Sequence, residues 1–179
     1  MMVKIIQIGD DRLRTVCEPI SILEIDSPKT KQLLKDLSDA LRSQDDGVAI
    51  SAPQIGVTKR IFAVSTKIFD EDYLAGELEK KFYEHLYFIN PKITKSSAKT
   101  EEMEEGCLSI RGVYGMVKRP KNVNMEALNE KAEKVTRGAG GLLARIFQHE
   151  IDHLDGILFI DRASSIKETP SEKININHE

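Results

Sequence analysis

The sequence predicts an α+β fold, in which antiparallel or mixed β-sheets pack around a buried central helix. Three observations support this class. The candidate strands lie in the early and middle parts of the chain, and the most apolar helix, 140–154, follows them, an order typical of α+β proteins. The 179 residues are 40% apolar and 31% charged, which is the balance of a globular protein. A chain of this length predicts one domain.

A first helix is predicted over residues 27–42. Ser27 can accept a hydrogen bond at its N-terminus, and Pro28 suits the first turn. The residues that recur at helical spacing on its apolar face are Leu33, Leu34, Leu37, Ala40 and Leu41. The sequence Asp-Asp-Gly at 45–47 is expected to end the helix.

Two strands are predicted before residue 92. The segment 59–65 is apolar and reads as a buried strand, and 86–89 reads as another that Asn90 and Pro91 should end. The charged segment between them, 66–86, is expected to be a long loop with one helical turn.

A hairpin and a helix are predicted in the last third of the chain. Residues 122–128 alternate between apolar and polar, and a turn at 129–130 should lead to a partner strand near 132–136. The helix 140–154 carries a wide apolar stripe, and Gly156 is a suitable stop. Composition turns polar after Arg162, so we expect one domain over 1–162 and a flexible polar tail over 163–179.

Composition also excludes several classes of protein. With 26 basic and 29 acidic residues the net charge is -3, which argues against a direct nucleic-acid role. No apolar run approaches the roughly 18 residues of a membrane span, and the short apolar patch at 3–8 is not a secretory signal. A cytoplasmic protein is expected, in which two cysteines, Cys17 and Cys107, do not form a disulfide scaffold.

The clearest chemical signal is the segment HEIDH at 149–153. Residues four apart on a helix lie on one face, so His149 and His153 can bind the same metal ion. Glu150 lies about 100° around the helix from His149, where it can reach a metal-bound water without being a ligand. A buried helix strengthens this interpretation, because unpaired imidazole and carboxylate groups are costly to bury.

The third ligand separates the possible kinds of metalloprotein. One peptidase motif places a third histidine where this chain has Phe159, and another uses a downstream glutamate, for which Glu168 and Glu172 in the polar tail are poor candidates. The upstream Cys107 is a further candidate, because a divalent metal stabilises a thiolate. The charge run 101–105 just before it is expected to form a solvated face.

Three segments together resemble peptide deformylases. Residues 105–109, EGCLS, are similar to one family motif, and QHEIDHLDG at 148–156 is similar to the motif QHExDHLxG. The segment GVAISAPQ at 47–54 resembles the family's GxGLAAPQ. The motifs occur in the family's order, and the similarity runs from about residue 3 to residue 162.

The resemblance implies a metal-dependent hydrolase. Its ligands would be Cys107, His149 and His153, with water in the fourth position. The metal is typically Fe²⁺, and Zn²⁺, Ni²⁺ or Co²⁺ can occupy such a site. The substrate would be the N-terminal formyl-methionine of nascent proteins, from which the enzyme releases formate. Transient contact with the ribosome is implied, although the tail lacks the basic helical face of a docking helix.

The resemblance also implies roles for neighbouring residues. Glu150 would move the proton of the attacking water to the leaving amine. The Gln54 amide and the Leu108 backbone N–H would stabilise the oxyanion. The substrate-binding residues would be Gly47, Val48, Ala49 and Gly106.

This chain departs from the family pattern at several positions. Ala49, Ile50 and Ser51 replace the usual Gly, Leu and Ala, and Arg111 stands where many members have proline. An arginine that is common a few residues later is replaced near Tyr114. These departures leave the ligands unchanged and affect expected substrate contacts.

Two other functions remain open from the sequence. A metallopeptidase of the HExxH type would cleave internal peptide bonds, but the third histidine is missing. A non-catalytic binding module would need a fourth protein ligand to close the metal site, and no good candidate is evident.

Overall fold

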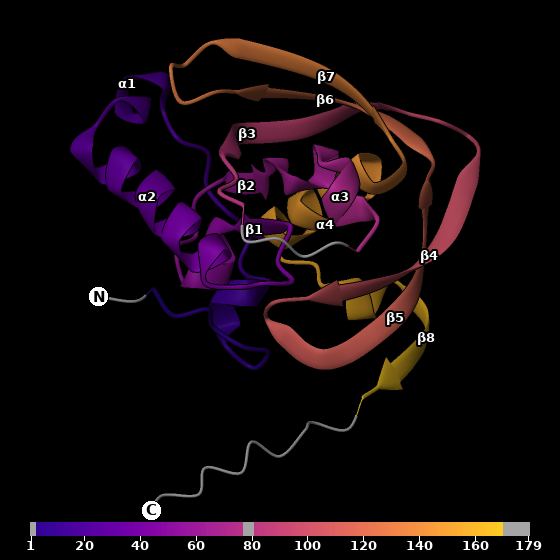
Figure 1. Ribbon diagram of the computed structural model, residues 1–179. Coiled ribbons are helices and arrows are strands. Elements are labelled where there is room, and N and C mark those ends of the chain that lie inside the picture. The colour runs from indigo at the N-terminus through magenta and orange to yellow at the C-terminus, as the bar shows by residue number, and fades with distance from the viewer. Residues whose placement is uncertain (1–2, 77–80, 170–179) are drawn as a thin grey trace, which may run out of the picture.

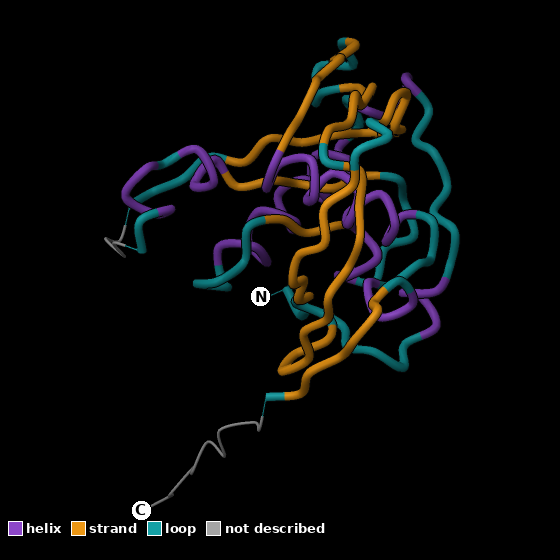
Figure 2. Tube along the Cα trace, turned by 90° about the vertical axis from the view of Figure 1, so that its right-hand side faces the viewer, coloured by secondary structure: helices purple, strands orange, loops and turns teal. Residues whose placement is uncertain are grey.

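The computed structural model describes residues 3–76 and 81–169. Two antiparallel sheets and two long helices make up the fold, which confirms the expected α+β class. One sheet has five strands in the order β1-β2-β3-β6-β7, and the other has three in the order β4-β5-β8. Figure 1 shows α4 between the two sheets and α2 on the outside of the larger one. Figure 2, turned by 90°, follows the long strands down to the end of β8.

The elements of the larger sheet come from three parts of the chain. Its strands are β1 (Ala49–Ser51), β2 (Ile61–Ser65), β3 (His85–Ser96), β6 (Asn122–Leu128) and β7 (Lys134–Gly140). The smaller sheet contains β4 (Thr100–Cys107), β5 (Ile110–Pro120) and β8 (Ala163–Glu168). Short helical segments connect them: η1 (Asp11–Arg14), α1 (Ile22–Ile25), η2 (Ala52–Ile55), η3 (Thr66–Phe69), α3 (Glu71–Leu74) and η4 (Phe159–Asp161).

Helix α2 (Pro28–Arg42) forms where the sequence predicts it. The Ser27 hydroxyl accepts a hydrogen bond from the Thr30 N–H at 3.2 Å, which satisfies one free donor at the helix start. All five apolar residues of the predicted face are buried. They pack against the neighbouring strands β1 and β2 in one of the apolar clusters of the core.

Helix α4 (Gly141–Leu154) contacts both sheets. Its apolar side chains Ala144, Ile146, Phe147, Ile151 and Leu154 are all buried. The Phe147 ring lies 5.2 Å from that of Phe88 and 6.0 Å from that of Phe62, so α4 is fixed on strands β2 and β3. The segment 149–153 forms the last part of this helix and lies within the fold rather than at its surface.

Strand β3 is longer than the sequence predicts. Asn90 and Pro91 do not end it, because the strand continues through a bulge to Ser96. Asn90 adopts a left-handed conformation with φ 51°, which asparagine tolerates better than most residues. Its side chain accepts from the Ile20 N–H at 2.8 Å and donates to the Ile20 carbonyl at 2.7 Å. These contacts with a distant segment stabilise the bulge.

Other boundaries also differ from the expectation. The partner of β6 begins at Lys134 rather than 132, and strands β4 and β5 were not predicted. The expectation of a flexible tail after Arg162 is wrong for residues 163–168, because they form strand β8, which pairs with β5. The rest of that tail, 170–179, lies outside the described residues. Between residues 66 and 76 the expected loop contains η3 and α3.

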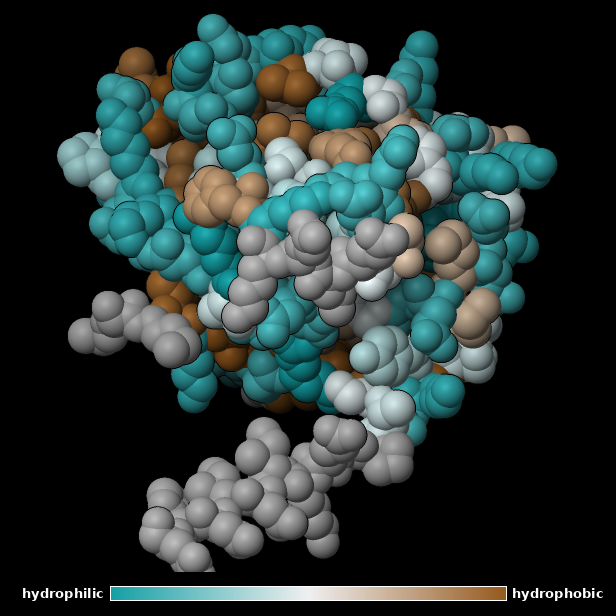
Figure 3. Space-filling view, viewed as in Figure 1, coloured by the Kyte–Doolittle hydropathy of each residue, from teal (hydrophilic) through white to brown (hydrophobic). Residues whose placement is uncertain are grey.

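The face seen in Figure 3 is mostly hydrophilic, with apolar side chains visible between the polar ones. None of the helices in the described ranges is both long enough and apolar enough to cross a bilayer.

The turn after α4 requires glycine at position 156. Gly156 has φ 73°, and a Cβ there would lie 2.5 Å from the Arg14 carbonyl oxygen. Gly9 is a matched control, because it also has positive φ (103°) but open space around the Cβ position.

We expect Gly156→Ala to lower the free energy of unfolding by about 2–4 kcal/mol, because a clash with backbone adds to left-handed strain. Gly9→Ala carries only the strain, about 1 kcal/mol. Urea unfolding of the two variants measures this difference. Equal losses would show that the contact with Arg14 contributes nothing.

Candidate metal centre

Three potential metal ligands meet at one point between the sheets. Cys107 is the last residue of β4, and His149 and His153 lie one turn apart on α4. Their ligand atoms all lie within 4.8 Å of one another. The Cys107 Sγ is 3.1 Å from His153 Nε2, and the two imidazole rings are 5.0 Å apart. The geometry therefore brings together the three residues that the sequence predicts as ligands.

A tight turn places Cys107 in this position. Residues 108 and 109 connect β4 to β5, and the chain pairs Cys107 with Ile110 across the turn. The N-terminal segment supports the turn, since Gln7 Nε2 donates to the Leu108 carbonyl at 3.0 Å and the Ile8 N–H donates to the Ser109 carbonyl at 2.8 Å. These contacts hold the carbonyls of Leu108 and Ser109 and so support the turn that follows Cys107.

Glu105 orients His149. Its Oε2 accepts from His149 Nδ1 at 3.0 Å, which leaves the Nε2 atom of that ring for a metal. Glu105 is 6% exposed, and two buried arginines satisfy its carboxylate. Arg119 donates to both oxygens at 2.6 and 2.9 Å, and Arg145 donates to Oε1 at 2.6 Å. Residues 101–104 alternate between half-buried and exposed, as expected of a solvated face, whereas Glu105, which also belongs to the cysteine motif, is buried.

A second buried carboxylate extends the same network. Asp152 accepts from Arg119 at 2.8 Å and from Arg162 at 2.7 Å, and it lies on α4 between the two histidines in sequence. Four residues of this network were not predicted from the sequence: Glu105, Arg119, Arg145 and Asp152. The available signal was charge on elements otherwise predicted to be buried: Arg145 and Asp152 belong to a helix whose apolar stripe predicts burial.

These contacts favour the ionised forms of Glu105 and Cys107. Burial opposes ionisation of Glu105, but hydrogen bonds from Arg119 and His149 outweigh it and lower its pKa well below the usual range. Burial likewise opposes ionisation of Cys107, yet the charges and hydrogen bonds of His153 and His149 lower its pKa to about 5. A thiolate is the form of cysteine that binds a metal.

Glu150 has the environment of a proton-transfer group. It is 4% exposed and its Oε2 has no hydrogen-bond partner within the described chain. Burial raises its pKa, and the nearby histidines only partly offset this. A carboxyl whose pKa is raised toward neutrality can both accept and donate a proton. The three ligand atoms and this unpartnered oxygen fit a metal ion with a bound water.

Gln54 reaches the cluster from the other side. It lies in η2 after β1 and is 1% exposed. Its Oε1 accepts from the Ser51 N–H at 2.8 Å, and its Nε2 is 3.4 Å from the Cys107 Sγ. The amide N–H groups therefore point to the region around the three ligands.

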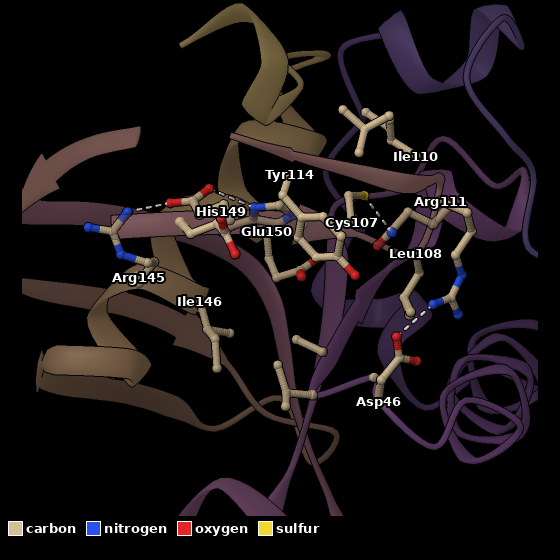
Figure 4. Close-up of a pocket in the computed structure, with 18 of the residues that line it drawn as sticks. Asp46, Cys107, Leu108, Ile110, Arg111, Tyr114, Arg145, Ile146, His149 and Glu150 are labelled. Carbon is tan, nitrogen blue, oxygen red and sulfur yellow. Dashed lines mark hydrogen bonds and ion pairs between the residues drawn. The ribbon is translucent and has the colours of Figure 1, made fainter. Parts of the chain in front are cut away.

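An open cavity of about 340 Å³ leads to these residues. Figure 4 shows Cys107, His149 and Glu150 along its wall, and Tyr114 and Arg111 beside them. The proposed substrate-binding residues Gly47, Val48, Ala49 and Gly106 all line it, together with apolar Leu142 and Ile146 of α4.

The two glycines of this lining are tightly enclosed. A Cβ at Gly106 would lie 2.9 Å from the Tyr114 ring, and one at Gly47 would lie 3.0 Å from Leu41. Arg111 forms a 2.7 Å ion pair with Asp46 at the edge of the cavity. Three positions at which this chain departs from the family pattern line the cavity: Ala49, Arg111 and Tyr114.

The position of a third histidine in the extended peptidase motif is filled by an aromatic ring. Phe159 is 1% exposed and stacks on His149 with 6.3 Å between ring centres. Glu168 is exposed in β8, and Glu172 lies outside the described residues. The described geometry thus favours Cys107 over these alternatives as the third ligand.

A sulfur–nitrogen cluster beside an unpartnered carboxyl, at the base of an open cavity, is typical of metallohydrolases. The polypeptide deformylase family model matches residues 2–169. Peptide deformylase 2 of Clostridium acetobutylicum is 43% identical over 152 residues, which cover 85% of this chain and 89% of that protein. The Fusobacterium nucleatum peptide deformylase is 41% identical, with 92% and 85% covered.

Solved structures agree with the sequence comparisons. The chain is similar to a Synechococcus elongatus peptide deformylase in complex with actinonin, with a TM-score of 0.76, 34% identity, and 91% and 79% of the two chains covered. It is also similar to an Acinetobacter baumannii peptide deformylase with Met-Ala-Ser bound, with a TM-score of 0.78, 32% identity, and 90% and 98% covered. The chain belongs to the polypeptide deformylase family, whose members are metal-dependent hydrolases that remove the N-formyl group from methionine.

We expect Glu105→Gln to lower the free energy of unfolding at pH 7 by about 3–5 kcal/mol, because it leaves buried Arg145 without a charged partner and buried Arg119 with Asp152 alone. Urea unfolding measures the loss, with Glu104→Gln as the control on the exposed side of the same strand.

The same experiment at lower pH measures how the stability contribution of Glu105 depends on pH. Because the pKa of Glu105 is lowered by folding, its contribution is complete above the unfolded pKa of about 4.3 and is lost as the pH falls toward the folded value. A stability of Glu105→Gln equal to that of the parent would show that this network is not stabilising.

Proposed function

We propose that this chain removes the formyl group from the N-terminal formyl-methionine of nascent proteins, with Cys107, His149 and His153 as the ligands of a divalent metal on the central helix α4. The convergence of one sulfur and two imidazole rings within 4.8 Å is the observation that carries the proposal. One catalytic domain, to which β8 adds a strand, would perform the reaction.

Fe²⁺ is the proposed native metal, and Zn²⁺, Ni²⁺ or Co²⁺ would also fit a mixed sulfur and nitrogen donor set. Such an ion supplies a nucleophilic water at neutral pH and polarises the formyl oxygen. The family resemblance supports iron in particular, because the donor set alone is equally typical of zinc.

Glu150 is the proposed general base and acid. Its raised pKa and its unpartnered Oε2 suit a group that takes a proton from the attacking water and gives it to the departing amine. The side chain is only 4% exposed, so bulk water has little access to this carboxyl.

Gln54 and Leu108 are the proposed oxyanion donors. The Gln54 N–H groups face the cluster, and the Leu108 N–H lies next to Cys107 in the tight turn between β4 and β5. Donors that are already oriented stabilise the transition state without reorganisation. The loss of one such donor costs about 3–4 kcal/mol of barrier in comparable enzymes.

The substrate backbone would lie along Gly47, Val48, Ala49 and Gly106, with the methionine side chain against the apolar part of the cavity. Nascent chains are the proposed partners, reached by transient ribosome contact, and a cytoplasmic location follows from this substrate. No direct nucleic-acid or membrane role is proposed.

The function is tested by offering a formyl-Met-Ala-Ser peptide and an unmodified protein to the metal-loaded enzyme in parallel. Formate release without internal cleavage is the expected result. Cleavage of the unmodified protein, with no formate from the peptide, would instead assign an HExxH peptidase activity.

We expect Glu150→Ala to retain the metal and to lower kcat by at least 10²-fold, because a positioned general acid–base contributes about 10²–10⁴-fold. Glu150→Gln, which keeps the shape of the side chain, should lose as much. Metal analysis and formate assays measure the two effects. Substantial turnover in both variants would remove Glu150 from the mechanism.

We expect Cys107→Ser to weaken metal binding, because a hydroxyl does not ionise as the thiol does. Competition with a chelator measures the affinity, and Cys17→Ala is the control for loss of the other cysteine, which is buried away from the cluster. An unchanged metal affinity in Cys107→Ser would contradict the ligand set.

A further inference from the structure

Ser51 is a buried hydroxyl at the junction of the proposed catalytic groups. It is the last residue of β1, it is 0% exposed, and it precedes Gln54 by one helical turn. The family motif that this segment resembles has alanine here, so the hydroxyl is not explained by the resemblance. The hydrogen bonds of Ser51 identify Gln54 as its partner.

Both donors of Ser51 point at the same oxygen. The backbone N–H lies 2.8 Å and the hydroxyl 3.0 Å from Gln54 Oε1. With its oxygen fixed by two donors, the amide directs its nitrogen to the other side, 3.4 Å from the Cys107 Sγ. A reversed amide would place N–H groups against the Ser51 N–H and leave buried donors unpaired, which is costly.

We propose that the Ser51 hydroxyl is a positioning residue, which keeps the Gln54 amide turned with its N–H groups toward the reacting formyl oxygen. This inference rests on the function proposed above. Ser51 itself does not contact the reacting atoms. It acts by restricting a side chain whose donors must already be oriented when negative charge develops.

The Glu150 carboxyl is an alternative partner for the Ser51 hydroxyl. The Ser51 side chain also faces the Glu150 carboxyl, where it favours the charged form. The hydroxyl has one proton, so it can donate to only one of Gln54 and Glu150 at a time. The hydrogen bond that the hydroxyl makes in the structure, at 3.0 Å, is with Gln54.

The decisive kinetic experiment is a double-mutant cycle of Ser51→Ala and Gln54→Ala in the metal-loaded enzyme. We expect Ser51→Ala alone to lower kcat about tenfold, the equivalent of one hydrogen bond, with KM changed less than twofold. In the Gln54→Ala background, the same substitution should cause no further loss. A tenfold loss in both backgrounds would overturn the proposal and assign the effect to Glu150.

Ser65→Ala is the matched control, because Ser65 is also buried (3% exposed) but its hydroxyl contacts the Lys67 N–H rather than Gln54. It should leave kcat unchanged. Metal content and melting temperature of each variant show whether Ser51→Ala acts through folding instead.

A spectroscopic measurement tests the orientation of the Gln54 amide without relying on turnover. In the zinc-loaded protein, the Gln54 side-chain amide is assigned as the ¹⁵N signal pair that Gln54→Ala lacks. We expect Ser51→Ala to shift this pair and to speed its hydrogen exchange, and Ser65→Ala to leave it unchanged. An unmoved pair would contradict the positioning role. The absence of formate release by the parent enzyme would instead contradict the proposed function, whatever the amide signals show.

Discussion

The buried ion-pair network around Glu105 is the interaction on which the arrangement of the site depends. It joins β4, β5 and the helix α4 through contacts of 2.6–2.9 Å with Arg119 and Arg145. Burying such charges is favourable only when each has its partners in good geometry. Because the same carboxylate also contacts His149, the network fixes the small sheet and one metal ligand at the same time.

The opposite side of the site is organised by neutral hydrogen bonds. Ser51 and Gln54 come from the end of β1 and the turn after it, and both are almost completely buried. The cluster of Cys107, His149 and His153 therefore lies between two kinds of side chain. On one side the charged network of Glu105 orients His149, and on the other the Gln54 amide directs its N–H groups to the cluster. This difference fits the two tasks proposed for the site, in which one side would hold the ligands of a cation and the other would stabilise negative charge in the substrate.

The sequence predicts those parts of the structure in which local pattern and burial agree. The apolar face of α2 and the histidines on α4 have strict helical spacing, and both helices form as expected. Strand β3 passes through Asn90 because a side chain contacts Ile20, 70 residues away, which local propensity does not contain. Strand β4 was missed because its glutamates suggest solvent, although Glu105 is buried by arginines from two other elements.

The ligand set shows the same division. Two candidate ligands four residues apart can be read from one segment, but the cysteine that completes the proposed set lies 46 residues from His153. Thiolate chemistry alone made Cys107 one candidate among others, and the resemblance to a family connected it with the histidines. The supporting residues Glu105 and Asp152 required the three-dimensional arrangement, since their partners lie on different elements.

The separation of Cys107 from α4 also has a consequence for the order of synthesis. A ribosome makes the thiol and the β4–β5 turn well before it makes the two imidazoles, and Arg162, which contacts Asp152, comes later still. Until residues 149–162 emerge, the sulfur has neither its nitrogen partners nor the arginine-supported carboxylate beside them. The growing chain therefore completes the candidate metal pocket only after Arg162 has been made.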